Sequence, residues 1–335
     1  MKPRLLIAAA AILLLAAIGF IALWRPAPID EPVRINIPSG SSFEAVMDSV
    51  EHHHATSSLP LLRSIARVIS YPENVKSGSY LITPDMGVLR LAFKLHRGNQ
   101  DPIRLTVGHV RTIDQLASSL SAQLACTSDS LLQLLRSDSV CASYGFTPAT
   151  IIALFPKNTY EVYWNIAPRQ LMKRMKREYD AFWNDRRKEQ CLKLNLTPIE
   201  VVTLASIVEE ETNQDDEKEN IASVYLNRIR RGMPLQADPT VKYAVGDFTL
   251  RRITASALRV ESPYNTYKNQ GLPPGPICLP GRASIDAVLA NRPTNYLYFC
   301  AREDFSGHHR FAATLTEHNA NATRYHQALN ARGIK

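Results

Sequence analysis

The sequence lacks the short-range cysteine patterns that bind metals or carry out redox chemistry. Its five cysteines show no CxxC pair and no zinc-type spacing. Because their number is odd, they cannot all pair within one chain. Cys126 and Cys141 lie close enough in sequence to form a disulfide in an oxidising compartment, and buried free thiols fit equally well. The sequence therefore predicts no metal site and no cofactor.

Nucleic-acid-binding motifs are also absent, although the chain is basic. Its 335 residues include 39 Lys and Arg against 31 Asp and Glu, which gives a formal net charge of +8. Such an excess attracts an acidic surface or polymer. We expect no nucleic-acid partner, because none is present in the compartment predicted below. An anionic cell-envelope polymer or lipid headgroup is the better candidate, and a solvated surface without a partner is the alternative.

One stretch near the N-terminus lacks charge altogether. It runs for 20 residues from Leu5 to Trp24. At about 1.5 Å per residue it is long enough for the ~30 Å core of a bilayer. A cleaved signal peptide has a shorter apolar region and an A-x-A-like site, which does not stand out here. Because Lys2 and Arg4 precede the stretch, we expect a single-pass anchor in the cytoplasmic (inner) membrane, with residues 1–4 in the cytoplasm and the rest on the periplasmic side.

The remaining chain divides by composition into four segments. A proline-containing linker is followed by a small α+β module, a mainly helical middle region and a mixed α/β domain, at residues 25–33, 34–102, 103–196 and 197–335. A short β-like run, a turn and an amphipathic helix recur from Arg34, Tyr80 and Ile103. The fold class predicted for the whole chain is α+β.

The last segment opens with a strong helix start. In TPIE, Thr197 is a helix N-cap, Pro198 occupies the first helical position and Glu200 completes a capping box. A second helix is expected over 217–231, and a closing helix at HNANATRYHQALNAR. Between them, a strand pair is expected near Tyr296–Cys300 and Phe311. Residues 232–282 are rich in loops, and a loop region of that length in a compact domain indicates a binding surface.

Three consecutive glutamates end the first of these helices, in LASIVEEETN. With Leu204 at zero and about 100° per residue, Glu211 falls at about −20°, on the apolar stripe. Glu209 and Glu210 fall on the polar face. A carboxyl in a dry pocket has a raised pKa, which suits a general acid. The alternatives are that Glu211 emerges into water or pairs with a nearby cation.

Ordinary glycosidases need two carboxylates at a defined separation. Asp238 and Glu261 are candidates for a second one, but no spacing singles them out. Chemistry that needs a single carboxyl is therefore the better match for this sequence.

Four long motifs resemble the MltG/YceG-like endolytic murein transglycosylases. They are LASIVEEET (204–212), ASVYLNRIRRGMPLQADPTVKYA (222–244), SPYNTYKNQGLPPGPI (262–277) and GHHRFAATLTEHNAN (307–321), in the family's order. FPKNTYE also resembles a family segment, but Lys157 and Asn158 stand where an acidic residue is expected. The resemblance implies that Glu211 is the catalytic acid and base.

The resemblance also implies a reaction and its surroundings. The bond cleaved would be MurNAc-β-1,4-GlcNAc in nascent peptidoglycan, with 1,6-anhydroMurNAc ends formed and no cofactor. Residues 34–102 would be a LysM-like glycan-binding module, residues 197–335 the catalytic domain, and penicillin-binding proteins or other glycan polymerases its neighbours. We expect amides and tyrosines of the loop-rich cleft to bind glycan, together with Thr212: Gln236, Tyr264, Asn265 and Tyr267. Their alternative role is loop scaffolding.

Two rival functions stay open at this point. A muramidase would hydrolyse the same bond with a second carboxylate and a positioned water. A membrane-tethered scaffold would bind peptidoglycan without cleaving it.

Overall fold

The computed structural model describes residues 3–250 and 252–333, and the chain forms two compact units in it. The first unit comprises residues 1–105, 123–126 and 160–167, and the second comprises 106–122, 127–159 and 168–335, within the described ranges. By these ranges the chain passes between the units five times, first within strand β3 (Ile103–Val107) and once within β4 (Asn158–Val162), and these two strands form a two-stranded sheet. The boundary expected after residue 102 lies close to the first crossing, whereas the expected middle region, 103–196, is divided between the units.

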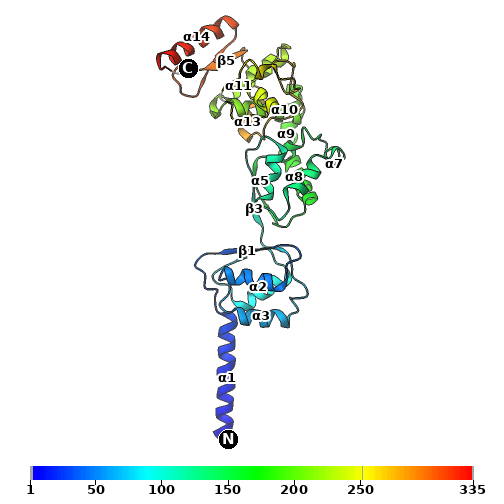
Figure 1. The fold of residues 1–335 in the computed structure, drawn as a ribbon, viewed down its shortest axis with the longest axis vertical. Helices are drawn as coiled ribbons and strands as arrows, with labels where there is room; N and C mark the ends of the chain where they lie inside the picture. Colours follow the sequence, from blue (N-terminus) through cyan, green and yellow to red (C-terminus); the bar gives the residue numbers. More distant parts are fainter. Residues whose placement is uncertain (1–2, 251, 334–335) are drawn as a thin grey trace. The chain divides into compact units, whose positions relative to one another are not determined.

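The first unit is a small α+β module behind an N-terminal helix (Figure 1). Its elements are α1 (Pro3–Trp24), β1 (Val33–Ile37), α2 (Phe43–His52), α3 (Leu59–Val68), β2 (Gly78–Ile82) and α4 (Val88–Arg97). Strands β1 and β2 pair antiparallel, with Ile35 opposite Tyr80. Both of these residues are fully buried under the helices with Met47 and Leu62. The expected strand-turn-helix recurrences are confirmed, and α3 was not anticipated.

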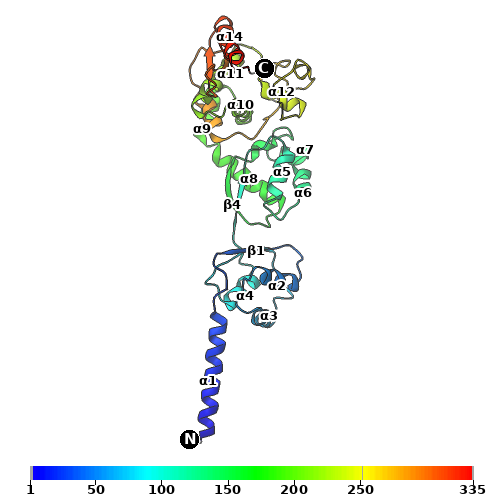
Figure 2. The same cartoon turned by 60° about the vertical axis from the view of Figure 1, so that its left-hand side comes forward.

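The second unit is mainly helical (Figure 2). Its α-helices are α5 (Ile113–Ser121), α6 (Ser128–Leu135), α7 (Asp138–Ser143), α8 (Pro168–Phe182), α9 (Asp185–Leu194), α10 (Pro198–Glu211), α11 (Lys218–Arg230), α12 (Asp238–Val245), α13 (Arg282–Ala290) and α14 (Leu315–Ala331). Short 3-10 turns cover Ile151–Leu154, Asp215–Glu217 and Ala257–Arg259. The hairpin of β5 (Tyr298–Ala301) and β6 (His309–Ala312) packs against α14.

The fold class is α+β with small sheets, as predicted. In residues 197–335, where a mixed α/β domain is expected, the regular elements of the described part are helices together with the β5–β6 hairpin. The expected helices at 198, 217–231 and the C-terminus are confirmed, as is the strand pair. Residues 232–282 contain α12 and a 3-10 turn between their loops.

The membrane anchor predicted from the sequence stays a prediction. Within the described residues, no helix is by itself long and apolar enough to cross a membrane. Helices α9 and α10 meet those criteria only as a pair bent by 77°, and residues Val201–Val208 of α10 are buried in the protein. Of the tail expected at 1–4, residues 1–2 lie outside the described ranges.

All five cysteines are free, so the candidate disulfide between Cys126 and Cys141 is not formed in this structure.

The N-terminal cap of α10 gives a direct test of the local fold. The Thr197 hydroxyl accepts a hydrogen bond from the Glu200 backbone, and the Glu200 carboxylate accepts one from Thr197 N–H at 2.7 Å. Thr197→Ala is expected to lower the free energy of unfolding by about 1 kcal/mol, measured by denaturant titration. Thr197→Ser keeps the hydroxyl and should remain near the wild type. Equal losses in both variants would show that the cap does not stabilise the helix.

Candidate active site

Helix α10 carries the three glutamates, and it lies inside the second unit. Each residue from Val201 to Val208 is buried, and α11, α12 and α13 pack around the helix. Figure 1 shows α10 beside α11 and α13, and Figure 2 labels α12 in the same unit. The helix therefore has no exposed polar face. The prediction that Glu209 and Glu210 continue such a face is wrong. All three carboxyls instead crowd at the C-terminal end of a helix, where the helix dipole disfavours negative charge.

Two of the three carboxylates are neutralised by cations from distant segments. Glu209 accepts hydrogen bonds from Lys157 at 3.2 Å, from Lys218 at 3.4 Å and from the Ser284 hydroxyl. Burial opposes ionisation of Glu209, but these contacts outweigh it and hold the pKa below its ordinary value. The side chain is only 13% exposed.

Glu210 is paired still more strongly. Arg111 donates to both of its carboxylate oxygens, at 3.1 and 2.8 Å, and His109 Nε2 lies 3.2 Å from Oε1. Burial raises the pKa of Glu210, yet the hydrogen bonds and charges of His109 and Arg111 lower it overall to about 2. Glu210 therefore stays ionised at any physiological pH.

Among the residues that the structure describes, no cation is in contact with Glu211. Its side chain is half-buried, and Oε1 accepts a hydrogen bond of 2.5 Å from the Tyr225 hydroxyl on α11. Loss of hydration is the largest effect and raises the pKa of Glu211 to about 7, with further increases from the charges of Asp238 and Glu210. Tyr225 and Lys242 act in the opposite direction. Glu211 is thus the one glutamate of the three that can hold a proton at neutral pH.

Glu211 lines two cavities of similar size. One holds about 340 Å³ and is also lined by Tyr225, Arg228, Leu235, Gln236, Asp238, Tyr267, Tyr298, Phe299, Leu315 and His318. The other holds about 350 Å³ and is also lined by Thr212, Asn213, Gln214, Ala301, Arg302, Phe305, Gly307, His308, His309 and Tyr325. A carboxyl shared by two cavities is suited to act on a bond in the middle of a polymer.

Three of the predicted binding residues line these cavities. Gln236 and Tyr267 line the first, and Thr212 lines the second. The Tyr267 hydroxyl donates to Asp238 at 2.7 Å. Gln236 has a φ of 53°, unusual for a residue with a side chain, and its side-chain oxygen accepts from Arg228 at 3.3 Å. Thr212 hydrogen-bonds the backbone of Gln214 rather than Glu211.

The other two predicted residues line neither cavity. Asn265 is fully buried, and its amide donates to the carbonyls of Leu258 and Val260 while its oxygen accepts from Tyr267 N–H. Its side chain therefore builds the loop, which was the alternative considered for it. Tyr264 packs its ring on Tyr243 with centroids 4.7 Å apart.

Sequence reasoning missed several residues that shape the site. Tyr225 lies 14 residues after Glu211 on the next helix, a separation that no helical period reveals. Arg228, on the same helix, is buried and donates to the carbonyls of Leu297 and Leu235, which fixes two cavity walls. Both lie inside the motif 222–244. The signal in the sequence that could have indicated a role for Tyr225 and Arg228 is the presence of two polar side chains on the apolar side of that helix.

Titration of Glu211 predicts how stability changes with pH. Because its folded-state pKa is raised from 4.5 to about 7, the protonated group favours folding below about pH 4.5, and this contribution is lost as the pH rises through 7. A tenfold change in proton affinity corresponds to about 1.4 kcal/mol. The stability of the wild type relative to Glu211→Gln should therefore fall by about 3 kcal/mol between pH 4.5 and 8, measured by denaturant titration with a chelator present.

Glu210→Gln is the matched control for that measurement. Because the pKa of Glu210 is already about 2, its contribution should not change across the same pH range. A flat difference between the wild type and Glu211→Gln would contradict a proton held by Glu211.

Comparison with known proteins places the chain in a family. A model of the YceG-like family matches residues 35–324. A protein named endolytic murein transglycosylase from Bacillus subtilis (strain 168) is 29% identical over 317 residues, which cover 89% of this chain and 86% of the relative. A protein of the same name from Streptococcus pneumoniae is 25% identical over 327 residues, and the match covers 88% of this chain but 58% of that longer relative.

A solved structure supports the same placement. The crystal structure of a YceG-like protein from Listeria monocytogenes matches with a TM-score of 0.58 and 29% identity, and covers 87% of this chain and 99% of that one. The similarity thus extends through both units rather than through the glutamate motif alone. Because the family model matches most of its length, this chain belongs to the YceG-like family.

Proposed function

We propose that this chain is an endolytic peptidoglycan lytic transglycosylase in which Glu211 alone acts as general acid and base. Membership of the YceG-like family and relatives named endolytic murein transglycosylases support a transglycosylase role. The observation that carries the assignment to Glu211 is its environment. Of the three carboxyls, it is the one that no cation contacts within the described parts of the chain, and it lines both cavities.

The reaction needs a group that first gives a proton and later takes one. Protonated Glu211 donates to the bridging oxygen of the MurNAc-β-1,4-GlcNAc bond, and that bond breaks to leave an oxocarbenium-like or oxazoline-like muramyl C1. The sugar's own 6-hydroxyl then attacks C1 and passes its proton to Glu211. A 1,6-anhydroMurNAc end forms, no water is consumed and Glu211 is restored. A pKa of about 7 suits both steps, because the two protonation states are then close in free energy.

Tyr225 prepares the carboxyl for this role. Its hydroxyl occupies Oε1 of Glu211, and within the described residues no hydrogen bond engages Oε2. Oε2 is therefore the oxygen that can carry the transferred proton. The same hydrogen bond stabilises the carboxylate that remains after the first step, so Tyr225 is a positioning residue for both halves of the reaction.

The two cavities provide space for sugars on either side of the cleaved bond. In the first, Arg228 fixes the Gln236 side-chain oxygen, which leaves the amide nitrogen to donate to an N-acetyl carbonyl. Tyr267 offers a ring for stacking on a pyranose, whereas the ring of Tyr298 is already stacked on His318 and lies under the Arg228 guanidinium. In the second, Thr212 and the loop of 301–309 form the walls. We assign no glycan contact to Asn265, and Tyr264 supports the cleft from outside the cavity.

The sequence supports attachment to the cytoplasmic membrane. The uncharged run Leu5–Trp24 coincides with most of α1, and basic residues precede it. An anchor of this kind would keep the active site beside newly made glycan and its polymerases, such as penicillin-binding proteins. The first unit, for which the sequence suggests a LysM-like module, would add a second glycan contact.

A hydrolytic muramidase is the second candidate, because the structure brings another carboxylate to the site. Asp238 lines the same cavity as Glu211, and its charge contributes to the raised pKa of Glu211. A hydrolase would use such a carboxylate to activate a water. The hydroxyl of Tyr267 already donates to Asp238 at 2.7 Å, so one oxygen of that carboxylate is occupied.

Mass spectrometry of digested glycan strands tests the proposal. The wild type is expected to release fragments with 1,6-anhydroMurNAc ends, and reducing ends would instead show a muramidase. Glu211→Gln keeps the size of the side chain but removes the acid, so the rate should fall at least about 100-fold.

Glu219→Gln is the matched control, because Glu219 is an exposed glutamate on α11 that lines neither cavity. It should digest glycan at the wild-type rate. Undiminished digestion by Glu211→Gln would overturn the role of Glu211, and a wild type that binds glycan without any cleavage would indicate a scaffold.

A further inference from the structure

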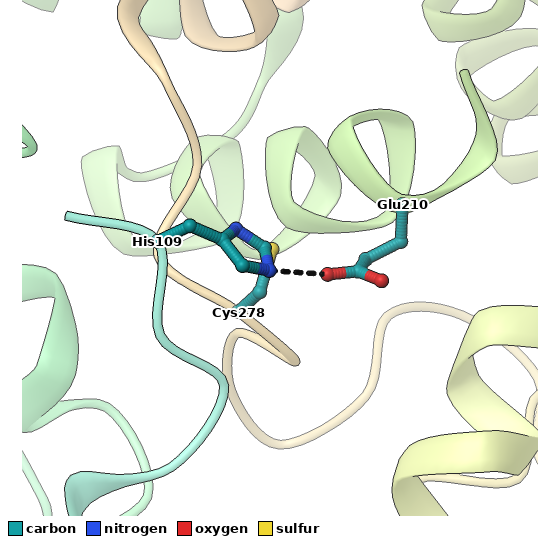
Figure 3. Close-up of side chains that lie close together, drawn as sticks. All are labelled: His109, Glu210 and Cys278. Carbon is teal, nitrogen blue, oxygen red and sulfur yellow. Dashed lines mark ion pairs between the residues drawn. The ribbon is translucent and has the colours of Figure 1, made fainter. Parts of the chain in front are cut away.

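Three side chains of different chemistry meet beside the active-site helix, away from both cavities. They are His109 in the loop after β3, Glu210 at the end of α10 and Cys278 in the loop before α13. One ligand atom from each lies within 4.8 Å of the other two. Figure 3 shows the imidazole, the carboxylate and the thiol directed toward one another from three separate segments.

The three groups form a donor set suited to zinc. Imidazole nitrogen, thiolate sulfur and carboxylate oxygen bind Zn²⁺ at about 2.0–2.3 Å, which places ligand atoms about 3.5 Å apart around a tetrahedral ion. His109 Nε2 and Glu210 Oε1 are already 3.2 Å apart. Small side-chain rotations would therefore bring all three donors into range. Borderline-soft ions such as zinc accept this mixture, whereas magnesium and calcium prefer oxygen alone.

The segments that carry the donors are already joined to one another. Leu279 N–H donates to the Val110 carbonyl at 2.7 Å, which links the loops of Cys278 and His109. Ile277 N–H donates to the Ser206 hydroxyl at 3.0 Å, which links the Cys278 loop to α10. A site held together before the ion arrives loses less conformational entropy on binding.

Glu210 also has an outer partner of the kind that orients metal ligands. Arg111 donates to Oε2 at 2.8 Å, and its backbone N–H is fixed by Gln115 at 2.8 Å. That contact can persist while Oε1 turns from His109 and Arg111 Nε toward an ion.

Beside Glu210 lies a cavity of about 40 Å³, which has room for a water as fourth ligand. It is also lined by Arg111, Pro239, Lys242, Phe248 and Ile277.

We propose that His109, Glu210 and Cys278 form a binding site for zinc or a similar divalent transition metal, with water in the fourth position. The ion would fasten the loops of residues 108–112 and 276–281 to the end of α10. Binding replaces the Cys278 proton, which leaves to solvent, so the site gains a thiolate as it gains two positive charges. Arg111 and Lys242 are the cations that face the ion, and Glu209 is the nearest further carboxylate in sequence.

Cobalt binding to the full chain tests this site directly. After treatment with a chelator, the chain is titrated with Co²⁺ alone and then with Zn²⁺ as a competitor. One Co²⁺ per chain is expected, with a thiolate-to-cobalt charge-transfer band and the visible bands of a tetrahedral ion. The charge-transfer band should vanish in Cys278→Ser and persist in Cys141→Ser, whose cysteine is buried elsewhere in α7.

His109→Gln keeps the test decisive if Cys278→Ser does not fold, because His109 is exposed and its loss leaves no cavity. This variant should bind Co²⁺ and Zn²⁺ at least about tenfold more weakly than the wild type. His308→Gln serves as its control and should bind as the wild type does. A wild type without a charge-transfer band, or an unchanged affinity in His109→Gln, would overturn the site and leave the three residues as an ion-pair cluster.

Discussion

The balance of charge at the end of α10 is the constraint on which the site depends. Three carboxyls lie at the C-terminal end of a buried helix, which is unfavourable for negative charge, and two of them are neutralised by Lys157, Lys218 and Arg111. A cation in contact with the third carboxyl, that of Glu211, would keep it ionised and leave no proton donor among the three. The protein instead leaves Glu211 with a tyrosine hydroxyl, so its carboxyl avoids an unpaired buried charge by keeping its proton.

The surrounding helices serve this arrangement. Helix α11 supplies Tyr225 to hold the carboxyl and Arg228 to fix the cavity walls. The loop that contains Arg111 brings a partner for Glu210, and helix α13 brings Ser284 as a partner for Glu209. Both partners come from distant parts of the chain. The residues around Glu211 therefore have two roles. Their ion pairs stabilise the end of α10, and they keep Glu209 and Glu210 ionised, so that Glu211 is the glutamate of the three that carries the proton. A metal at His109, Glu210 and Cys278 would strengthen the same junction.

The sequence predicted the helix of residues 198–211 and the distinct position of Glu211, but part of the reasoning differs from the structure. A helical wheel assumes that one face is wet, whereas α10 is buried on all sides. What separates Glu211 from its neighbours is that no cation in residues 3–250 and 252–333 contacts its carboxyl. Lys157 and Arg111 lie 52 and 99 residues before their partners, so no local pattern could reveal them. The resemblance likewise suggested Asn265 for a binding role, although its buried amide holds a loop. Local rules predicted caps, helices and the hairpin, because those depend on neighbouring residues.

Titration of the three glutamates measures directly whether Glu211 differs from Glu209 and Glu210 in its pKa. The carboxyl carbons of Glu209, Glu210 and Glu211 can be followed by ¹³C NMR in the chelator-treated chain, with Glu→Gln variants used for assignment. Glu211 is expected to titrate near pH 7, while Glu209 and Glu210 are expected to titrate below the ordinary value of 4.5. Titration of Glu211 near pH 4.5 or below, in the same range as its neighbours, would contradict a proton held by Glu211 at neutral pH.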